Sequence, residues 1–154
     1  MSYDKKLVEL GLDLPPPPAP TGLYKPMLLI DNMAYISGHG PLLDDGSYII
    51  GRLGEELDQQ AAYDAAGRAA LAILSTLRQG LGSLDRIRRV VKLFGMVNCM
   101  SDFNNHPAVI NGCSQVFSDI FGPEAGIGAR SAVGVGSLPM GIPVEIEAIF
   151  EVEN

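Results

Sequence analysis

A long helix lying between strand-like segments is the feature that most limits what this chain can fold into. Between about Leu57 and Leu81, apolar residues recur with the spacing of one helix face, at Ala66, Ala70, Ile73, Leu74, Leu77 and Leu81. Gly80 and Gly82 supply its stop. Strand-like apolar runs precede and follow this segment, so we expect helices packed on a sheet.

The segments around this helix predict five strands and a second helix. Met27–Ile30 and Met33–Ser37 form a predicted hairpin, and Ile87–Cys99 a long strand in which Gly95 favours a bulge. Pro107–Phe121 is the second helix, with proline in its first turn, and two further strands close the chain. This order packs most simply as an α+β fold, with one mixed sheet and both helices on one face.

The other face of this sheet then needs cover. Val90–Phe94 and Val144–Val152 carry too much apolar surface for a face that is open to water. We therefore expect the chain to form a homo-oligomer through the sheet, which would also create clefts between subunits.

Length and composition indicate one domain with an N-terminal arm. The chain has 154 residues and is 47% hydrophobic, enough for one core, and no shift in composition divides it. We assign residues 24–154 to this domain. Residues 1–23 form the arm, with a short helix over Asp4–Leu10 and a proline-rich, extended connector over Pro15–Pro20.

Charge and cysteine content exclude several classes of protein. The net charge of -7 disfavours nucleic acid as a partner, and the one basic cluster, Arg86–Arg89, is interpreted as a solvated loop. Cys99 and Cys113 lack the spacing of a zinc site and are expected to be buried, reduced thiols. The chain shows neither a signal peptide nor an apolar run of about 20 residues, so we expect a cytoplasmic location and no membrane.

Two alternating segments near the C-terminus carry the strongest indication of a site. Arg130 is flanked by small residues, and its guanidinium suits bidentate recognition of a carboxylate. Glu145 and Glu147 lie on the second segment, where alternation places both on the same face of the sheet. The alternative for Arg130 is a structural ion pair with one of these two glutamates.

These segments resemble the YjgF/YER057c/UK114 family, also called RidA. The resemblance rests on Arg130-Ser131, Leu138-Pro139, Val144–Ile149, Tyr24, Ile36-Ser37-Gly38, Asp102-Phe103, Asn111 and Phe117. It implies a chorismate-mutase-like fold and a homotrimer with three clefts between subunits. It also implies hydrolysis of small enamine and imine acids, such as 2-aminoacrylate, to 2-keto acids and ammonia, without a metal or cofactor.

The resemblance also assigns roles within the cleft. Glu145 is the expected catalytic residue and would position or deprotonate the attacking water, while Arg130 would hold the substrate carboxylate. The other expected substrate-binding residues are Tyr24, Ser37, Gly38, His39, Asn111 and Phe117. For Tyr24 the alternative is an aromatic at the edge of the core, and for Ser37 a turn residue. His106 begins a helix and is expected to be solvated or to cap it.

Departures from the deaminase pattern leave the activity open. Ala132 stands where the imine deaminases commonly have cysteine, and His39 where many have glutamine. The segment 121–128 is also longer and richer in glycine, which indicates a divergent subgroup. A non-catalytic trimer that binds a small carboxylate metabolite is the second hypothesis. An endoribonuclease is the third, and it fits an acidic chain without a histidine pair poorly.

Overall fold

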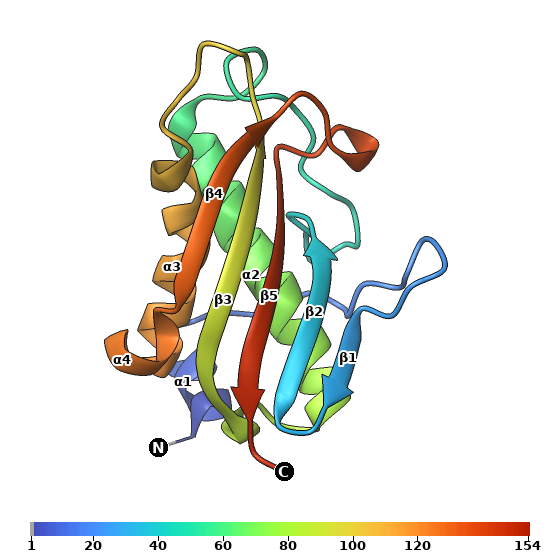
Figure 1. Cartoon of the computed structure of the whole chain (residues 1–154), viewed down its shortest axis with the longest axis vertical. Coiled ribbons are helices and arrows are strands. Elements are labelled where there is room, and N and C mark those ends of the chain that lie inside the picture. The colour runs from blue at the N-terminus through green and yellow to red at the C-terminus, as the bar shows by residue number, and fades with distance from the viewer. Residues whose placement is uncertain (1) are drawn as a thin grey trace.

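A five-stranded mixed sheet covered on one face by two long helices forms the domain (Figure 1). The computed structural model describes residues 2–154. The sheet order is β1-β2-β5-β3-β4, and only β3 and β4 pair in parallel. The strands are β1 (Met27–Ile30), β2 (Met33–His39), β3 (Ile87–Asn98), β4 (Ala129–Val135) and β5 (Val144–Val152). The α+β fold and the helices on one face are as the sequence predicts.

The helices begin and end where their capping residues allow. They are α1 (Tyr3–Glu9), α2 (Gln59–Leu81), α3 (His106–Phe121) and the short α4 (Pro123–Gly126), with 3-10 turns η1 (Leu84–Arg86) and η2 (Pro139–Gly141). The Asp58 side chain accepts a hydrogen bond from the Ala61 amide in the first turn of α2. Gly82 ends α2 in the left-handed conformation, at φ 85°. At the contact between α2 and α3, a Cβ on Gly112 would overlap the carbonyl oxygen of Tyr63.

Alternation along β5 separates the two faces of the sheet. Val144, Ile146, Ala148, Phe150 and Val152 are buried beneath the helices. Glu145, Glu147, Ile149 and Glu151 point to the opposite face, which no helix of residues 2–154 covers and which we call the open face. The two glutamates therefore share a face, as the alternation predicts.

The predicted bulge at Gly95 is wrong. The register of β3 against β5 shifts between Ile87 and Arg89 and again between Val90 and Lys92, whereas Gly95 pairs regularly with Ile146. A Cβ on Gly95 would lie 2.6 Å from side-chain carbons of Ile110 in α3. The glycine therefore serves the close approach of helix and sheet.

The N-terminal arm packs against the domain. Leu7 of α1 is only 2% exposed and belongs to the core. The Asp4 carboxylate accepts hydrogen bonds from the Ser83 hydroxyl at 2.6 Å and from the Leu84 amide at 3.1 Å. Further along, the Ser75 hydroxyl of α2 donates to the Pro15 carbonyl at 2.6 Å. Among residues 2–154, no helix is both long enough and apolar enough to cross a membrane.

Candidate functional site

Arg130 lies on the helix-covered side of β4, the strand at one edge of the sheet. It pairs with Leu93, a core residue of β3, and this register directs its side chain toward α3. Its Nη1 donates to Asn111 Oδ1 at 2.9 Å and to Ser114 Oγ at 3.0 Å, and its Nη2 donates to the Pro107 carbonyl at 3.3 Å. These three acceptors follow one face of α3, so the helix fixes the guanidinium.

All three acceptors are neutral. No carboxylate of residues 2–154 forms an ion pair with Arg130, so the alternative of a structural pair with Glu145 or Glu147 is wrong. A positioned cation with neutral supports keeps its charge available for an anionic ligand. Ser114 was not expected at the site; its spacing of three residues from Asn111, on the same helix face, is the signal that could have found it.

Glu145 lies on the open face of the sheet, against Gly38 of β2. A Cβ on residue 38 would be 2.7 Å from Glu145 Cδ, so only glycine leaves room for the carboxylate in this position. Burial raises the pKa of Glu145 above its ordinary value, and the like charge of Glu147 raises it further. A carboxylate in this condition is a candidate proton acceptor.

Arg130 and Glu145 therefore lie on opposite faces of one sheet. Arg130 pairs with Leu93 of β3 and Glu145 pairs with Met96, three residues along, which places the two side chains on different sides. A single protomer therefore does not bring Arg130 and Glu145 together, and a site shared by the two residues, in the cleft between subunits that the resemblance implies, stays a prediction.

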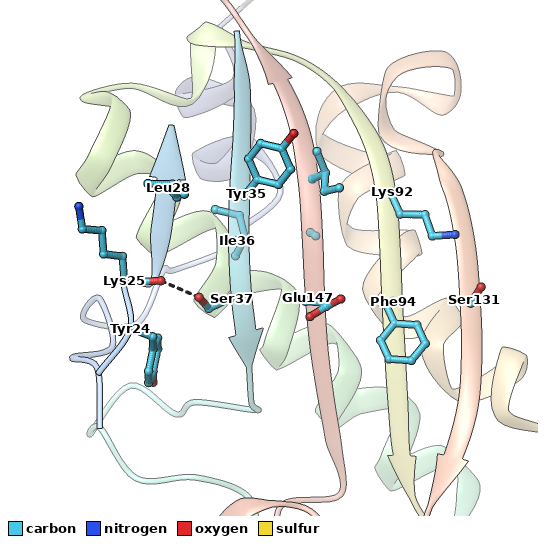
Figure 2. Close-up of a pocket in the computed structure, with 12 residues that line it drawn as sticks. Tyr24, Lys25, Leu28, Tyr35, Ile36, Ser37, Lys92, Phe94, Ser131 and Glu147 are labelled. Carbon is cyan, nitrogen blue, oxygen red and sulfur yellow. Dashed lines mark hydrogen bonds between the residues drawn. The ribbon is translucent and has the colours of Figure 1, made fainter. Parts of the chain in front are cut away.

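The open face carries a cavity of about 570 Å³. Figure 2 shows Ser37, Glu147, Phe94 and Ser131 in a row across β2, β5, β3 and β4. Tyr24 lies at one end of this cavity, and the Ser37 hydroxyl donates to the Lys25 carbonyl at 2.6 Å. The structure thus brings Tyr24 and Ser37 to one cavity. The other lining residues that the sequence analysis missed include Lys92 and Tyr35, which strand alternation could have assigned to this face.

His39 does not line this cavity. It follows a register shift between β2 and β5, which turns the ring toward α2, where it is 5% exposed. Its Nδ1 lies 2.6 Å from the Ser37 carbonyl and its Nε2 2.8 Å from Thr76 Oγ1. Because a carbonyl can only accept, we assign the proton to Nδ1. Burial lowers the pKa of His39, so the ring is neutral and supports Ser37 from behind.

Phe117 is a core residue and not a ligand contact. Its ring is fully buried and packs edge-on against Phe150 of β5, with 5.5 Å between ring centroids. The expectation of substrate contact at this residue is therefore corrected, because helix and sheet cover both sides of the ring.

His106 is partly buried and does not occupy the capping position of α3. Its Nε2 lies 3.5 Å from the Sγ of Cys99, and its ring meets Phe103 edge-on at 5.3 Å. Asn105 occupies the capping position without a side-chain capping bond. Cys99 and Cys113 are both buried and free, as expected. Within the part of the chain that the structure describes, His, Cys, Asp and Glu form no group of three that could hold a metal ion.

The fold is that of an α+β protein with a five-stranded mixed sheet, two long helices on one face and an arginine on an edge strand. Comparison with known proteins identifies the family. Residues 4–143 match the family model described as YjgF/chorismate mutase-like, putative endoribonuclease, and the chain belongs to this family.

Relatives match over nearly the whole chain. Protein TCP17 of Trypanosoma cruzi is 38% identical over 148 residues, covering 96% of this chain and 92% of that protein. The crystal structure of the protein Atu1372, of unknown function, from Agrobacterium tumefaciens aligns with a TM-score of 0.89 at 36% identity, covering 99% and 93% of the two chains. A putative endoribonuclease from Shewanella oneidensis aligns with a TM-score of 0.93 at 28% identity, covering 99% and 100%.

Proposed function

We propose that this protein hydrolyses small 2-imino and enamine acids to 2-keto acids and ammonia, in clefts between the subunits of a homotrimer. The observation that carries the proposal is the Arg130 guanidinium, fixed by Asn111, Ser114 and the Pro107 carbonyl without an acidic partner in residues 2–154. An arginine held in this way is suited to binding the carboxylate that all such substrates carry.

A second subunit is needed to complete the site. Arg130 lies at the β4 edge, whereas Glu145 lies on the open face, so a cleft that contains both takes Arg130 from one subunit and Glu145 from the next. Exposed apolar residues of β1 and β2 on the open face support such an assembly. They are Leu28, Ile30 and Tyr35, each between 41% and 51% exposed.

Within such a cleft the groups have distinct roles. Arg130 orients the substrate through its carboxylate and thereby places C2 for attack. An enamine substrate first takes a proton at C3, which gives the protonated imine. Ionised Glu145 accepts a proton from water as the oxygen bonds to C2 of this protonated imine, forming a neutral carbinolamine. Glu145 then returns that proton to the nitrogen, and as the hydroxyl group loses its own proton the carbon–nitrogen bond breaks, so ammonia leaves the 2-keto acid. Ser37 and Tyr24 supply hydroxyl groups along the neighbour's side of the cleft.

The test is release of ammonia and keto acid from freshly generated 2-aminoacrylate and 2-iminobutanoate, corrected for spontaneous hydrolysis. We expect the native protein to accelerate this release. Arg130→Ala should lose about 2 to 4 kcal/mol of transition-state stabilisation, measured as a fall in kcat/KM. Arg130→Lys is the matched variant, because it keeps the charge and loses the bidentate fork. Native protein that gives no acceleration, or Arg130→Ala with native turnover, would contradict the proposal.

A binding protein without catalysis is the second candidate. It is favoured by the neutral environment of Arg130, where an amide, a hydroxyl and a carbonyl hold the guanidinium and Ala132 supplies no thiol. This candidate predicts a higher midpoint of thermal unfolding with a 2-keto acid, such as 2-oxobutanoate, and no turnover.

The basic cluster gives an RNA-cleaving function little support. Arg88 forms an ion pair with Glu153 at 3.3 Å, and Arg89 pairs with Glu151 at 3.4 Å. The Arg86 guanidinium donates to the Glu153 carbonyl at 2.9 Å. These arginines are therefore engaged by β5 and by Glu153, which follows it, and an RNA backbone would have to compete for them.

A further inference from the structure

A second recess lies at the ends of β3 and β4, separate from Arg130 and from the open face. Its volume is about 330 Å³, at the lower end of the range for small-molecule sites. The lining residues that bear on its chemistry are Arg52, Cys99, Phe103, His106 and Gly134. A thiol and an imidazole thus share one small cavity.

Cys99 and His106 form a thiol–imidazole pair within this recess. The Cys99 Sγ is 3.5 Å from His106 Nε2, close enough for the thiol to donate its proton to the ring. Phe103 packs edge-on against His106 and holds the ring in place. Nucleophile and base are therefore positioned together, as thiol chemistry requires.

Gly134 allows the β4 backbone to pack closely against this pair. A Cβ at residue 134 would lie 3.0 Å from Cys99 Sγ and would overlap His106 Nε2. Any larger residue on this position of β4 would displace the base or the strand and so disturb the pair. Cys99 is 5% exposed and lines the recess, so a small molecule reaches the sulfur through this opening.

The charges around Cys99 set its resting state. Burial raises the pKa of the thiol, and Asp102 raises it further. The Arg52 guanidinium acts in the opposite direction, as does the Val135 backbone, and Arg52 also donates to the Cys99 carbonyl at 2.9 Å. The thiol is therefore protonated at neutral pH, and it needs a base to react.

We propose that the Cys99–His106 recess is a site of reversible thiol modification that takes a small-molecule disulfide. His106 Nε2 removes the thiol proton as the Cys99 sulfur attacks one sulfur of the disulfide. A new sulfur–sulfur bond forms, the original one breaks, and the departing thiolate takes the proton from His106. The products are a mixed disulfide on Cys99 and one free small thiol, so no further oxidant is consumed.

The chain contains its own control in Cys113. This cysteine is fully buried in α3, and burial shifts its thiol pKa far upward. Cys99 keeps 5% of its surface exposed and lines the recess, whereas Cys113 has no exposed surface, so a native chain should leave Cys113 unmodified. Modification of Cys99 alone is therefore the signature of the recess, whereas general unfolding would expose both thiols.

The experiment incubates the native protein with bis(2-hydroxyethyl) disulfide and locates the adduct by peptide mass spectrometry over time. We expect one adduct per chain, on Cys99, present in Cys113→Ser and absent in Cys99→Ser. His106→Asn should slow the reaction about tenfold or more at neutral pH. At alkaline pH hydroxide in the solvent forms the thiolate, so the reaction rates of the native protein and of His106→Asn should converge. If His106 served only to hold the structure, the difference between the two rates would persist at alkaline pH.

Gly134→Ala is the variant that tests the geometry of the pair, and it should slow the adduct at neutral pH because its Cβ would overlap His106 Nε2 and move the base away from the sulfur. Native protein left unmodified while urea-unfolded protein reacts would overturn the proposal. An equal rate in His106→Asn at neutral pH, with a native circular dichroism spectrum, would overturn it as well. None of these readouts depends on the proposed hydrolysis, so the two proposals fail separately.

Discussion

The Arg130 guanidinium is held by an amide oxygen, with Arg130 Nη1 2.9 Å from Asn111 Oδ1. A carboxylate in the place of that amide would neutralise the arginine, because aspartate differs from asparagine only in charge and donors. The amide holds the guanidinium in position without satisfying its charge. This relationship makes Asn111 the residue through which the charge of the site can be changed with the least change in shape.

Asn111→Asp should therefore raise KM about tenfold or more for a carboxylate-bearing substrate, with a smaller change in kcat. The new carboxylate would compete with the ligand for Arg130. Ser114→Ala is the matched control, since it removes another hydrogen bond to the same nitrogen without adding charge. Steady-state kinetics on 2-iminobutanoate measure both variants. An unchanged KM in Asn111→Asp would show that Arg130 does not bind the substrate carboxylate.

Glu145 should set the acid limb of the pH–rate profile. Its pKa is raised above the ordinary 4.5 by burial and by Glu147, and only the ionised form can accept a proton from water. The rate should thus rise with pH through a midpoint above 4.5. Glu145→Gln should abolish turnover and with it the acid limb of the profile. Glu147→Gln removes the like charge and should move the midpoint of that limb to lower pH. An unchanged midpoint in Glu147→Gln would show that a group other than Glu145 sets the acid limb.

The helices and strands could be predicted from the sequence because each depends on a local period. The spacing of apolar residues between Leu57 and Leu81 predicts α2, and the alternation of apolar and polar residues in Val144–Val152 predicts β5. The bulge predicted at Gly95 was wrong because a glycine within a strand can indicate either a bulge or the close approach of another element. The position of Ile110 in α3, which the local sequence does not show, decides between the two interpretations.

The arrangement of the site could not be predicted in the same way. Whether Arg130 and Glu145 share a face depends on the register in which β4 and β5 each pair with β3. The local sequence of either segment does not determine that register. His39 follows a register shift that reverses the face expected from simple alternation. The Cys99–His106 pair likewise depends on where β3 ends relative to α3.

Gly38 and Glu145 should be energetically coupled. Gly38→Ala places a Cβ 2.7 Å from Glu145 Cδ and should destabilise the fold by about 1 to 3 kcal/mol by overpacking. In a Glu145→Ala background the same substitution should cost much less, because the group that it meets is gone. A double-mutant cycle of urea unfolding measures this difference. Equal costs in the two backgrounds would show that Gly38 is required for another reason.

His39 should stabilise the fold at neutral pH and lose this contribution in acid. His39→Ala removes the bonds to the Ser37 carbonyl and Thr76 and leaves a buried gap, at a cost of about 3 kcal/mol.

Because burial lowers the pKa of His39 in the folded state, the unfolded chain binds more protons below about the ordinary value of 6.5. Stability should therefore fall as the pH decreases from that value toward the lowered pKa. His39→Gln can replace both hydrogen bonds without titrating, so its stability should depend less on pH in this window. Urea unfolding at several pH values checks both variants, and an identical pH dependence in native protein and His39→Gln would contradict the assignment.

The open face should be the surface through which subunits associate. Tyr35 is 41% exposed there and lines the cavity beside Glu147, so Tyr35→Glu would bury a charge on association while leaving the core of the protomer unchanged. We expect this variant to sediment as a monomer and to lose turnover, since the proposed cleft takes Arg130 and Glu145 from different subunits. Val8→Glu is the matched control, because Val8 is 80% exposed on α1, away from the sheet. A trimer that persists in Tyr35→Glu would place the subunit interface elsewhere.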